Sequence, residues 1–449
     1  MKNKFVHIVL LLMFFITNSI TAEQITIDDV RALALANSPS LARFQLAVES
    51  ARLDEKTRIY DNLPSLSLGV SASGQLWGET NIQDSIKTGA NFGVSQKLFD
   101  GGKSIYMKAI NAINTESARQ DALTAYFSVL DTADSAYYET LKAAAALETR
   151  TAALETAALA LSMSELRLGS GMISRGDYLK AMAEQGQAET AWNRAVRDLT
   201  VSKANLKNST GLKEIPELAA IDFDVYEDAL RTLSTLSEDR IAMLTERFSA
   251  SAKANNPGLL KTNLQLQAAE RNVGLAKTDY IPSLNASIST GISYSTAAET
   301  AGGGLSAFPN GSVSISGSIP LDYWVIASSV KKKRMAQTQA ALTLRDAESA
   351  LAVEIQTALL DLIGYALSVQ SARRADEYAR QNYEYTLELY KLSQASVFVL
   401  SDAIALAGDS HTQRLTAEYG FLTGLSKLRS LCAFESPDEV INLLLSKQQ

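Results

Sequence analysis

The chain has 449 residues, a formal net charge of -7 at pH 7, two histidines and one cysteine. An acidic chain is a poor nucleic-acid binder, because affinity for the phosphate backbone comes from Lys and Arg, so we expect no nucleic-acid partner. The single Cys432 excludes an internal disulfide, and His7 and His411 are too few for a His-rich metal site. No HExxH, CxxC, GxSxG or Walker A motif occurs, and we therefore predict no enzyme, no cofactor and no metal site.

The N-terminus has the pattern of a cleaved signal peptide. Lys2 and Lys4 precede an apolar run from Phe5 to Ile16, which polar residues and the small Ala22 follow. This run is too short to cross a bilayer, so we expect it to be removed on export. After it, no apolar run approaches the length of a membrane helix.

The first half of the mature chain predicts helices, two strands and a long helix. The expected elements are helical residues 27–61, strands at 65–76 and 86–98, a helix over 103–168 and a helix over 177–207. Pro39 interrupts the first helical segment. In both strands apolar residues alternate with Ser, Gly, Asn or Lys, which predicts one apolar face and one small polar face. The proline-free long helix would extend roughly 100 Å.

The second half repeats this order. Pro39 and Pro257 are 218 residues apart, as are Pro64 and Pro282. The second series is helical at 249–280, forms strands at 283–294 and 312–319, and is helical again at 325–391 and 402–431. We expect two tandem repeats, each with two long strands and a long helix flanked by two half-length helices. The predicted divisions are a signal peptide at 1–22, a first repeat at 23–211, an equatorial linker element at 212–246, a second repeat at 247–435 and a C-terminal tail at 436–449.

The four strands favour a membrane barrel over a soluble sandwich, although alternation alone fits both. Their length of roughly 10–13 residues suits a tilted membrane strand, which needs about 9–11. Aromatic residues lie near the strand ends, where membrane barrels place their girdles. These candidate girdle residues are Trp77, Phe99, Tyr294, Phe308, Tyr323 and Trp324. An open sheet edge cannot face lipid, so further copies must close the barrel, with eight strands from two copies or twelve from three.

The long helices predict coiled-coil packing. Leu351, Ile355, Ala358 and Leu362 follow one another at steps of four and three residues, which is the spacing of a coiled-coil seam. An ordinary soluble coiled coil fits these heptads equally well.

The chain resembles the TolC-like outer membrane efflux protein family over essentially its whole mature length. The resemblance is carried by Asn37 to Leu41, Leu63 to Leu66, Leu98 to Gly102, Gly171 to Asp177, Ser209 to Leu212, Asn256-Pro257 and Ile281 to Leu284. It implies a mainly helical protein with a membrane β-barrel, in which a homotrimer forms a 12-stranded β-barrel and a 12-helix α-barrel tunnel. It further implies a passive exit duct that contacts outer membrane lipid and works with a periplasmic adaptor and an inner-membrane transporter, in efflux or type I secretion.

The resemblance also implies a periplasmic gate at two helix turns. The motifs place Asp177 after the first turn, Tyr390 before the second turn and Asp402 after it. The family's arginine falls at Ala395 and its turn glycine near Ser393, so Arg175 is the substitute candidate for the arginine. Helix capping is the alternative role for Asp177 and Asp402.

Two other functions fit the sequence less well. A periplasmic adaptor or scaffold with a long coiled-coil hairpin is the runner-up, but it would show one hairpin between β-rich domains and not two repeats with paired strands. A hydrolase that uses carboxylates alone is more distant, because no spacing marks a pair of acids. The cargo, whether drugs, proteins or metal ions, stays open.

Overall fold

The computed structural model describes residues 24–73, 87–295 and 306–445, so the predicted signal peptide and Trp77 lie outside the described residues. The chain divides into two compact units. The helical unit comprises Met1–Ala42, Thr124–Asn256 and Leu351–Gln449, and the strand-bearing unit comprises Arg43–Leu123 and Pro257–Ala350. Two long helices, α4 (Lys103–Gly169) and α9 (Tyr323–Lys391), contribute residues to both units.

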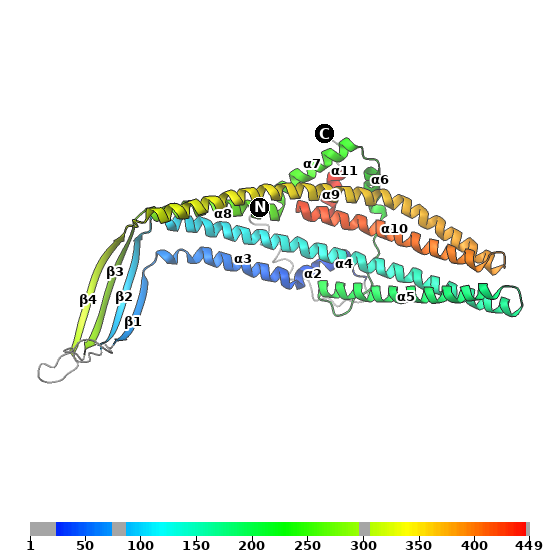
Figure 1. The fold of residues 1–449 in the computed structure, drawn as a ribbon, viewed down its shortest axis with the longest axis horizontal. Helices are drawn as coiled ribbons and strands as arrows, with labels where there is room; N and C mark the ends of the chain where they lie inside the picture. Colours follow the sequence, from blue (N-terminus) through cyan, green and yellow to red (C-terminus); the bar gives the residue numbers. More distant parts are fainter. Residues whose placement is uncertain (1–23, 74–86, 296–305, 446–449) are drawn as a thin grey trace. The chain divides into compact units, whose positions relative to one another are not determined.

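The strand-bearing unit contains one antiparallel sheet in the order β1-β2-β3-β4 (Figure 1). Its strands are β1 (Ser65–Ser73), β2 (Lys87–Phe99), β3 (Ser283–Ser295) and β4 (Ser306–Ser318). All four predicted alternating runs therefore form strands. The start of the fourth was predicted too late, at 312, because Phe308, Pro309 and Asn310 break the alternation. Proline is tolerated there because β4 is an edge strand, where a missing N–H breaks no ladder hydrogen bond within the sheet.

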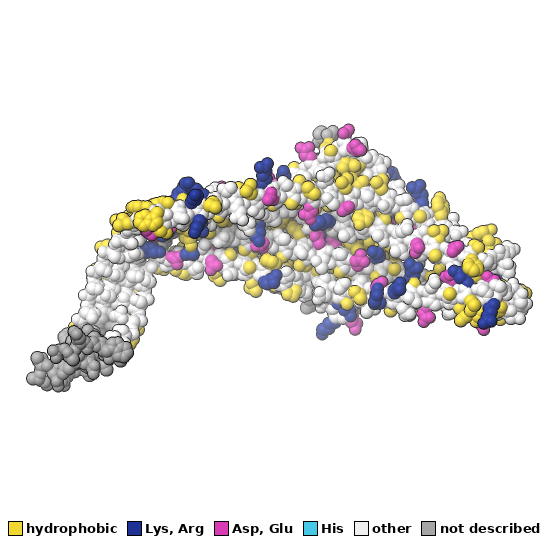
Figure 2. Space-filling view, in the orientation of Figure 1, with side chains coloured by type: hydrophobic (Ala, Val, Ile, Leu, Met, Phe, Trp, Pro, Cys, Tyr) yellow, Lys and Arg dark blue, Asp and Glu magenta, His cyan; other side chains and the backbone are white. Residues whose placement is uncertain are grey.

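The two faces of the sheet differ as the alternation predicts. On one face serine hydroxyls pair across strands, at 2.6 Å for Ser65 and Ser95 and 2.7 Å for Ser287 and Ser314. Figure 2 shows almost no hydrophobic or charged side chain on the visible face of the strands. The other face carries apolar side chains that remain exposed, such as Val313 at 78%. An apolar face without cover needs a partner or a lipid environment.

A tight turn joins β2 to α4. Gly101 and Gly102 adopt positive φ angles of 70° and 86°, a region that glycine enters without steric cost. The Asp100 carboxylate accepts hydrogen bonds from the backbone N–H groups of Gly102 at 3.0 Å and Ser104 at 2.9 Å. A Cβ atom on Gly101 would lie only 3.1 Å from the Thr278 carbonyl oxygen. The Asp-Gly-Gly motif thus ends the strand and starts the helix in one step.

The other helices of the strand-bearing unit lie along the same segment of α4 and α9. They are most of α3 (Pro39–Thr57), the short helix η2 (Tyr60–Asn62), α8 (Pro257–Lys277) and the short helix η4 (Thr278–Tyr280). Ala276 of α8 packs with Ile326 and Val330 of α9 in one buried cluster. The predicted break at Pro39 is present, and Pro257, inside the segment predicted as helical over 249–280, likewise opens a helix.

The helical unit contains the rest of α4 and α9 and several shorter helices. These are α2 (Ile27–Asn37), α5 (Arg175–Thr210), η3 (Asp224–Tyr226), α6 (Glu227–Ser234), α7 (Glu238–Asn255), α10 (Val397–Cys432) and α11 (Pro437–Leu445). The tail helix α11 contacts α6 of the predicted equatorial element. Helix α10 begins at Val397, five residues before the predicted start at Asp402, because Ser396 is the residue that caps it.

The core of the helical unit follows the predicted seam of α9. Leu351, Ile355, Ala358 and Leu362 are buried there. The helical unit also buries a charged cluster that the sequence analysis did not find. The Asp134 carboxylate pairs with Arg31 at 2.6 Å and with Arg429 at 3.1 Å, and such a buried charge requires its partners.

One helix of the described residues, α9, contains an 18-residue window that is apolar enough to cross a membrane by length and composition, although the sequence predicted no membrane helix. Within this window 39% of the residues are buried inside the structure. Ile355, Leu359 and Leu362 of α9 pack in the core of the helical unit.

Candidate functional site

Two turns of the helical unit, between α4 and α5 and between α9 and α10, carry the predicted gate residues. In each turn a backbone N–H bonds the carbonyl five residues back: Met172 to Arg167 at 2.8 Å and Gln394 to Leu389 at 2.8 Å. This is the longer hydrogen bond of a Schellman motif. Gly171 and Ser393 take the left-handed positions, with φ angles of 71° and 61°. Ser393 therefore adopts the conformation that glycine would favour, and the two turns close in the same way despite the different residue.

Tyr390 is the predicted gate residue with the most contacts. It is 2% exposed, and its hydroxyl donates to the carbonyl oxygen of Ala160 at 3.0 Å. Because that hydroxyl has only one hydrogen, the Ser164 hydroxyl, 3.0 Å away, acts as donor to the Tyr390 oxygen. The ring lies in a buried apolar cluster that includes Ala181 and Leu400. Tyr390 thus joins α9 to α4 near the turns.

Arg167 completes this contact and was missed by the sequence analysis. Its guanidinium donates to the carbonyl oxygen of Tyr390 at 2.6 Å and lies 4.6 Å from the centre of the tyrosine ring. A cation at this distance over an aromatic face is attracted by the ring. Ala160, Ser164 and Arg167 follow at steps of four and three residues, so they share one face of α4. This spacing can be read from the sequence, but it does not predict that the partner is Tyr390, 223 residues away.

Asp177 has the capping role that the sequence analysis offered as an alternative. Ser174 is the N-cap of α5, and Asp177 is the third helical residue. The Asp177 carboxylate accepts from the Ser174 backbone N–H at 3.1 Å, and the Asp177 N–H donates to the Ser174 hydroxyl at 3.1 Å. This reciprocal pair is a capping box. The carboxylate also strengthens the start of α5 through the helix dipole.

Asp402 does not cap α10, so the capping alternative is wrong for this residue. Ser396 accepts the capping bond from Val399, and Asp402 lies exposed in the second turn of the helix. Arg175 is the exposed first residue of α5. Within the described part of this chain, no hydrogen bond or ion pair links Arg175, Asp177 and Asp402 with one another.

The candidate girdle residues that the structure describes are exposed at both ends of the sheet. Phe99 and Trp324 lie at the end where the helices begin, and Tyr294 lies at the opposite end of β3. Tyr323 stacks on Tyr280 with ring centres 6.0 Å apart, and Tyr280 was not among the predicted girdle residues. For Phe308 only the backbone is described, paired with Ser293 in the sheet. The girdle remains a prediction.

The comparisons with known proteins identify the family. The family model described as outer membrane efflux protein matches residues 30–212 and 249–431, one segment in each of the two predicted repeats. A comparison with the curated proteins finds no match. The family model covers most of the chain, and the chain therefore belongs to the outer membrane efflux protein family. It is an outer membrane exit channel with a long helical part in the periplasm, and the adaptor alternative is not favoured.

Solved structures share the fold of the chain at low identity. The CmeC outer membrane channel of Campylobacter jejuni is 16% identical, with a TM-score of 0.73 over 96% of this chain and 94% of that chain. The outer membrane protein VceC of Vibrio cholerae is 14% identical, with a TM-score of 0.67 over 90% and 95%. The open state of the MtrE channel of Neisseria gonorrhoeae is 17% identical, with a TM-score of 0.65 over 90% and 88%. These likenesses show a common fold over nearly the whole chain.

Proposed function

We propose that three copies of this chain form a passive exit duct, with a 12-stranded β-barrel in the outer membrane and a 12-helix α-barrel tunnel in the periplasm. One observation carries the proposal: β1 and β4 are open edges of a four-stranded sheet whose apolar face is exposed. Backbone groups at such edges have no hydrogen-bond partners in lipid, so the edges must meet strands of other copies.

Three copies serve a duct better than two. An eight-stranded barrel is filled by its own side chains, whereas a wider barrel leaves an aqueous bore. The serine and glycine face of the sheet is small and wettable, which suits the lining of such a bore, and the apolar face suits outer membrane lipid. The girdle residues Phe99, Tyr294, Phe308, Tyr323, Trp324 and Trp77 would then lie near the two membrane surfaces.

The duct needs partners for its energy. The sequence has no Walker A motif, so nucleotide hydrolysis would be supplied by another protein. We infer a tripartite efflux or type I secretion system, in which an inner-membrane transporter supplies the energy and a periplasmic adaptor connects it to the duct. The chain itself would perform no catalysis.

The gate of the duct would lie at the two helix turns. Tyr390 holds α9 against α4 through Ala160, Ser164 and Arg167, and opening would require these contacts to loosen. Asp402 on three copies would place three carboxylates around one axis, which favours cations over anions. Asp177 would keep α5 in register by capping, and Arg175 would be free to meet a neighbouring copy.

Single-channel conductance in planar bilayers, combined with the mass of the purified protein in detergent, tests the proposal. A trimer that gives discrete, cation-preferring conductance steps is the expected result. A monomer or dimer would overturn the twelve-stranded barrel, and a trimer without conductance would overturn the duct.

A further inference from the structure

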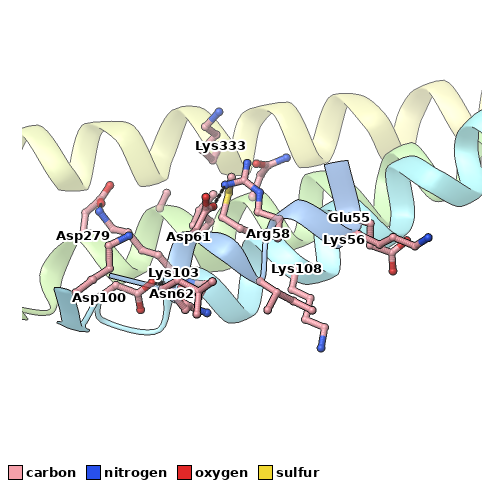
Figure 3. Close-up of a pocket in the computed structure, with 18 of the residues that line it drawn as sticks. Glu55, Lys56, Arg58, Asp61, Asn62, Asp100, Lys103, Lys108, Asp279 and Lys333 are labelled. Atoms are coloured by element: carbon pink, nitrogen blue, oxygen red, sulfur yellow. Dashed lines mark hydrogen bonds and ion pairs between the residues drawn. The ribbon is translucent and has the colours of Figure 1, made fainter. Parts of the chain in front are cut away.

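A second candidate site lies within the strand-bearing unit and has no part in the gate. It is a cavity of about 1170 Å³ between α3, α4, α8 and α9 (Figure 3). This volume is slightly above the usual range of small-molecule sites, about 300–1,000 Å³. Eight Lys and Arg side chains line the cavity, against four Asp and Glu side chains. The cavity is thus strongly basic, although the whole chain is acidic.

Two of the acidic side chains are already neutralised. Asp61 pairs with Arg58 at 2.6 Å, and Asp279 pairs with Lys103 at 2.6 Å. A third acidic residue, Asp100, holds the start of α4 by accepting backbone hydrogen bonds. The fourth, Glu55, accepts a hydrogen bond from the Thr115 hydroxyl at 3.0 Å, and within the described residues none of the four forms an ion pair with the remaining lysines.

Besides Lys97, whose charge acts on the Asp100 carboxylate, three lysines of the cavity form no ion pair with any carboxylate of the described residues. They are Lys56 on α3, Lys108 on α4 and Lys333 on α9. In the view of Figure 3, Lys333 extends upward and Lys108 downward from the lining residues, and Lys56 lies to the right beside Glu55. Like charges on three helices around one hollow repel one another, and a bound anion would relieve that repulsion.

The remaining lining indicates which kind of anion would fit. Apolar side chains, including Ile59, Leu63 and Met107, line the cavity beside the lysines. An ammonium group binds phosphate as a point charge from varied directions, so separated lysines suit a ligand with several negative oxygens. We propose that this cavity binds a phosphate-bearing anion, supplied either by a lipid headgroup or by a free phosphorylated solute.

Calorimetric titration of the full-length purified protein in neutral detergent with inorganic pyrophosphate tests the site. We expect saturable binding that weakens with added salt, because mobile ions screen exposed charges over about 10 Å at 0.1 M. The triple variant Lys56→Gln, Lys108→Gln, Lys333→Gln should bind about tenfold more weakly. These side chains are exposed, so the variant should fold.

A matched control variant distinguishes specific binding in the cavity from non-specific attraction of pyrophosphate to surface lysines. The variant Lys203→Gln, Lys207→Gln, Lys213→Gln removes the same charge from exposed lysines of the helical unit that do not line the cavity. It should bind pyrophosphate as the unmodified protein does. Equal weakening in both triple variants, or no binding by the unmodified protein, would overturn the proposal.

Nanodiscs distinguish the two sources of phosphate. The pyrophosphate titration is repeated in discs of phosphatidylcholine alone and in discs that also contain phosphatidylglycerol. If anionic headgroups occupy the cavity, phosphatidylglycerol should suppress pyrophosphate binding to the unmodified protein. If a free solute is the ligand, binding should be equal in the two kinds of disc. Neither outcome depends on conductance, so failure here is distinguishable from failure of the duct.

Discussion

Arg167 and Tyr390 are joined twice, by a 2.6 Å hydrogen bond from the guanidinium to the tyrosine carbonyl oxygen and by the stacking of the guanidinium 4.6 Å from the ring centre. The two residues lie in the last turns of the long helices α4 and α9. Their contact therefore fixes the two helix turns against each other within one chain. It also supplies a cation near the proposed gate, where Ala395 stands at the position of the arginine that the family resemblance implies.

Replacing Tyr390 with phenylalanine should weaken this end of the helical unit. The change removes the bonds to Ala160 and Ser164 and leaves the buried carbonyl and hydroxyl less well satisfied, at a cost of about 1–2 kcal/mol. We expect a lower denaturation midpoint and more frequent channel opening. Tyr385→Phe on the exposed face of α9 is the control and should change neither quantity. Equal behaviour of the two variants would contradict the proposed role of Tyr390 in holding α9 against α4.

Arg167 and Arg175 are both candidates for the cation that holds the proposed gate closed, and substitutions distinguish between them. Arg167→Gln removes the cation from the Tyr390 ring and should increase the fraction of time that the channel is open. Arg175→Gln removes an exposed charge that has no partner in the described part of the chain, and it should have the smaller effect. Single-channel recording of both variants measures this difference. The reverse order would show that Arg175, acting on another copy, holds the gate.

Replacement of Asp402 should change ion preference. Three exposed carboxylates around one axis attract cations, so Asp402→Ala should reduce the cation-to-anion permeability ratio measured as a reversal potential in a salt gradient. Asp409→Ala removes an equal charge from an exposed position seven residues further along α10. Its reversal potential should stay close to that of the unmodified protein. If Asp402→Ala leaves the permeability ratio unchanged, Asp402 does not lie on the conduction path.

Adjacent residues of β4 should respond oppositely to a charge. Val313 belongs to the apolar face and Ser314 to the hydroxyl face. Val313→Lys puts a charge toward lipid, which costs up to about 2–4 kcal/mol at the bilayer midplane, and should reduce insertion into the membrane. Ser314→Lys should insert normally but alter conductance. Membrane fractionation and conductance measure the two effects, and equal insertion of both variants would contradict the assigned faces.

The buried thiol of Cys432 should make stability depend on alkaline pH. Burial raises the pKa of Cys432 from 9.0 to about 12. Above pH 9 the unfolded thiol ionises while the folded thiol does not, so the folded state loses relative stability as pH rises toward 12. This loss is at most about 1.4 kcal/mol per pH unit.

The measurement compares denaturation midpoints at about pH 8 and about pH 10.5. The unmodified protein should lose more stability between these two pH values than the variant Cys432→Ala. Both proteins contain the same other groups that titrate at alkaline pH. Parallel losses in the two proteins would show that the thiol does not contribute.

Local patterns in the sequence determined most of the elements. Period-two alternation placed all four strands, because one apolar and one polar face require it. Pro39 marked a helix break, because proline lacks the N–H that a helix interior needs, whereas the break at Pro257 was not predicted. The prediction failed where the local signal was weak: at the start of β4, where Pro309 interrupts the alternation, and at the start of α10, where the cap is Ser396 and not Asp402.

Only the tertiary structure decided which distant residues meet. Residue spacing placed Ser164 and Arg167 on one face of α4, but the packing of α9 brought Tyr390 onto that face. The pairing of Arg31 and Arg429 with Asp134 likewise joins three helices. The basic cavity of the strand-bearing unit is lined by lysines of α3, α4 and α9. Periodicity depends on neighbours along the chain, whereas ion pairs, buried hydroxyls and cavities depend on which helices pack together, and no single segment carries that information.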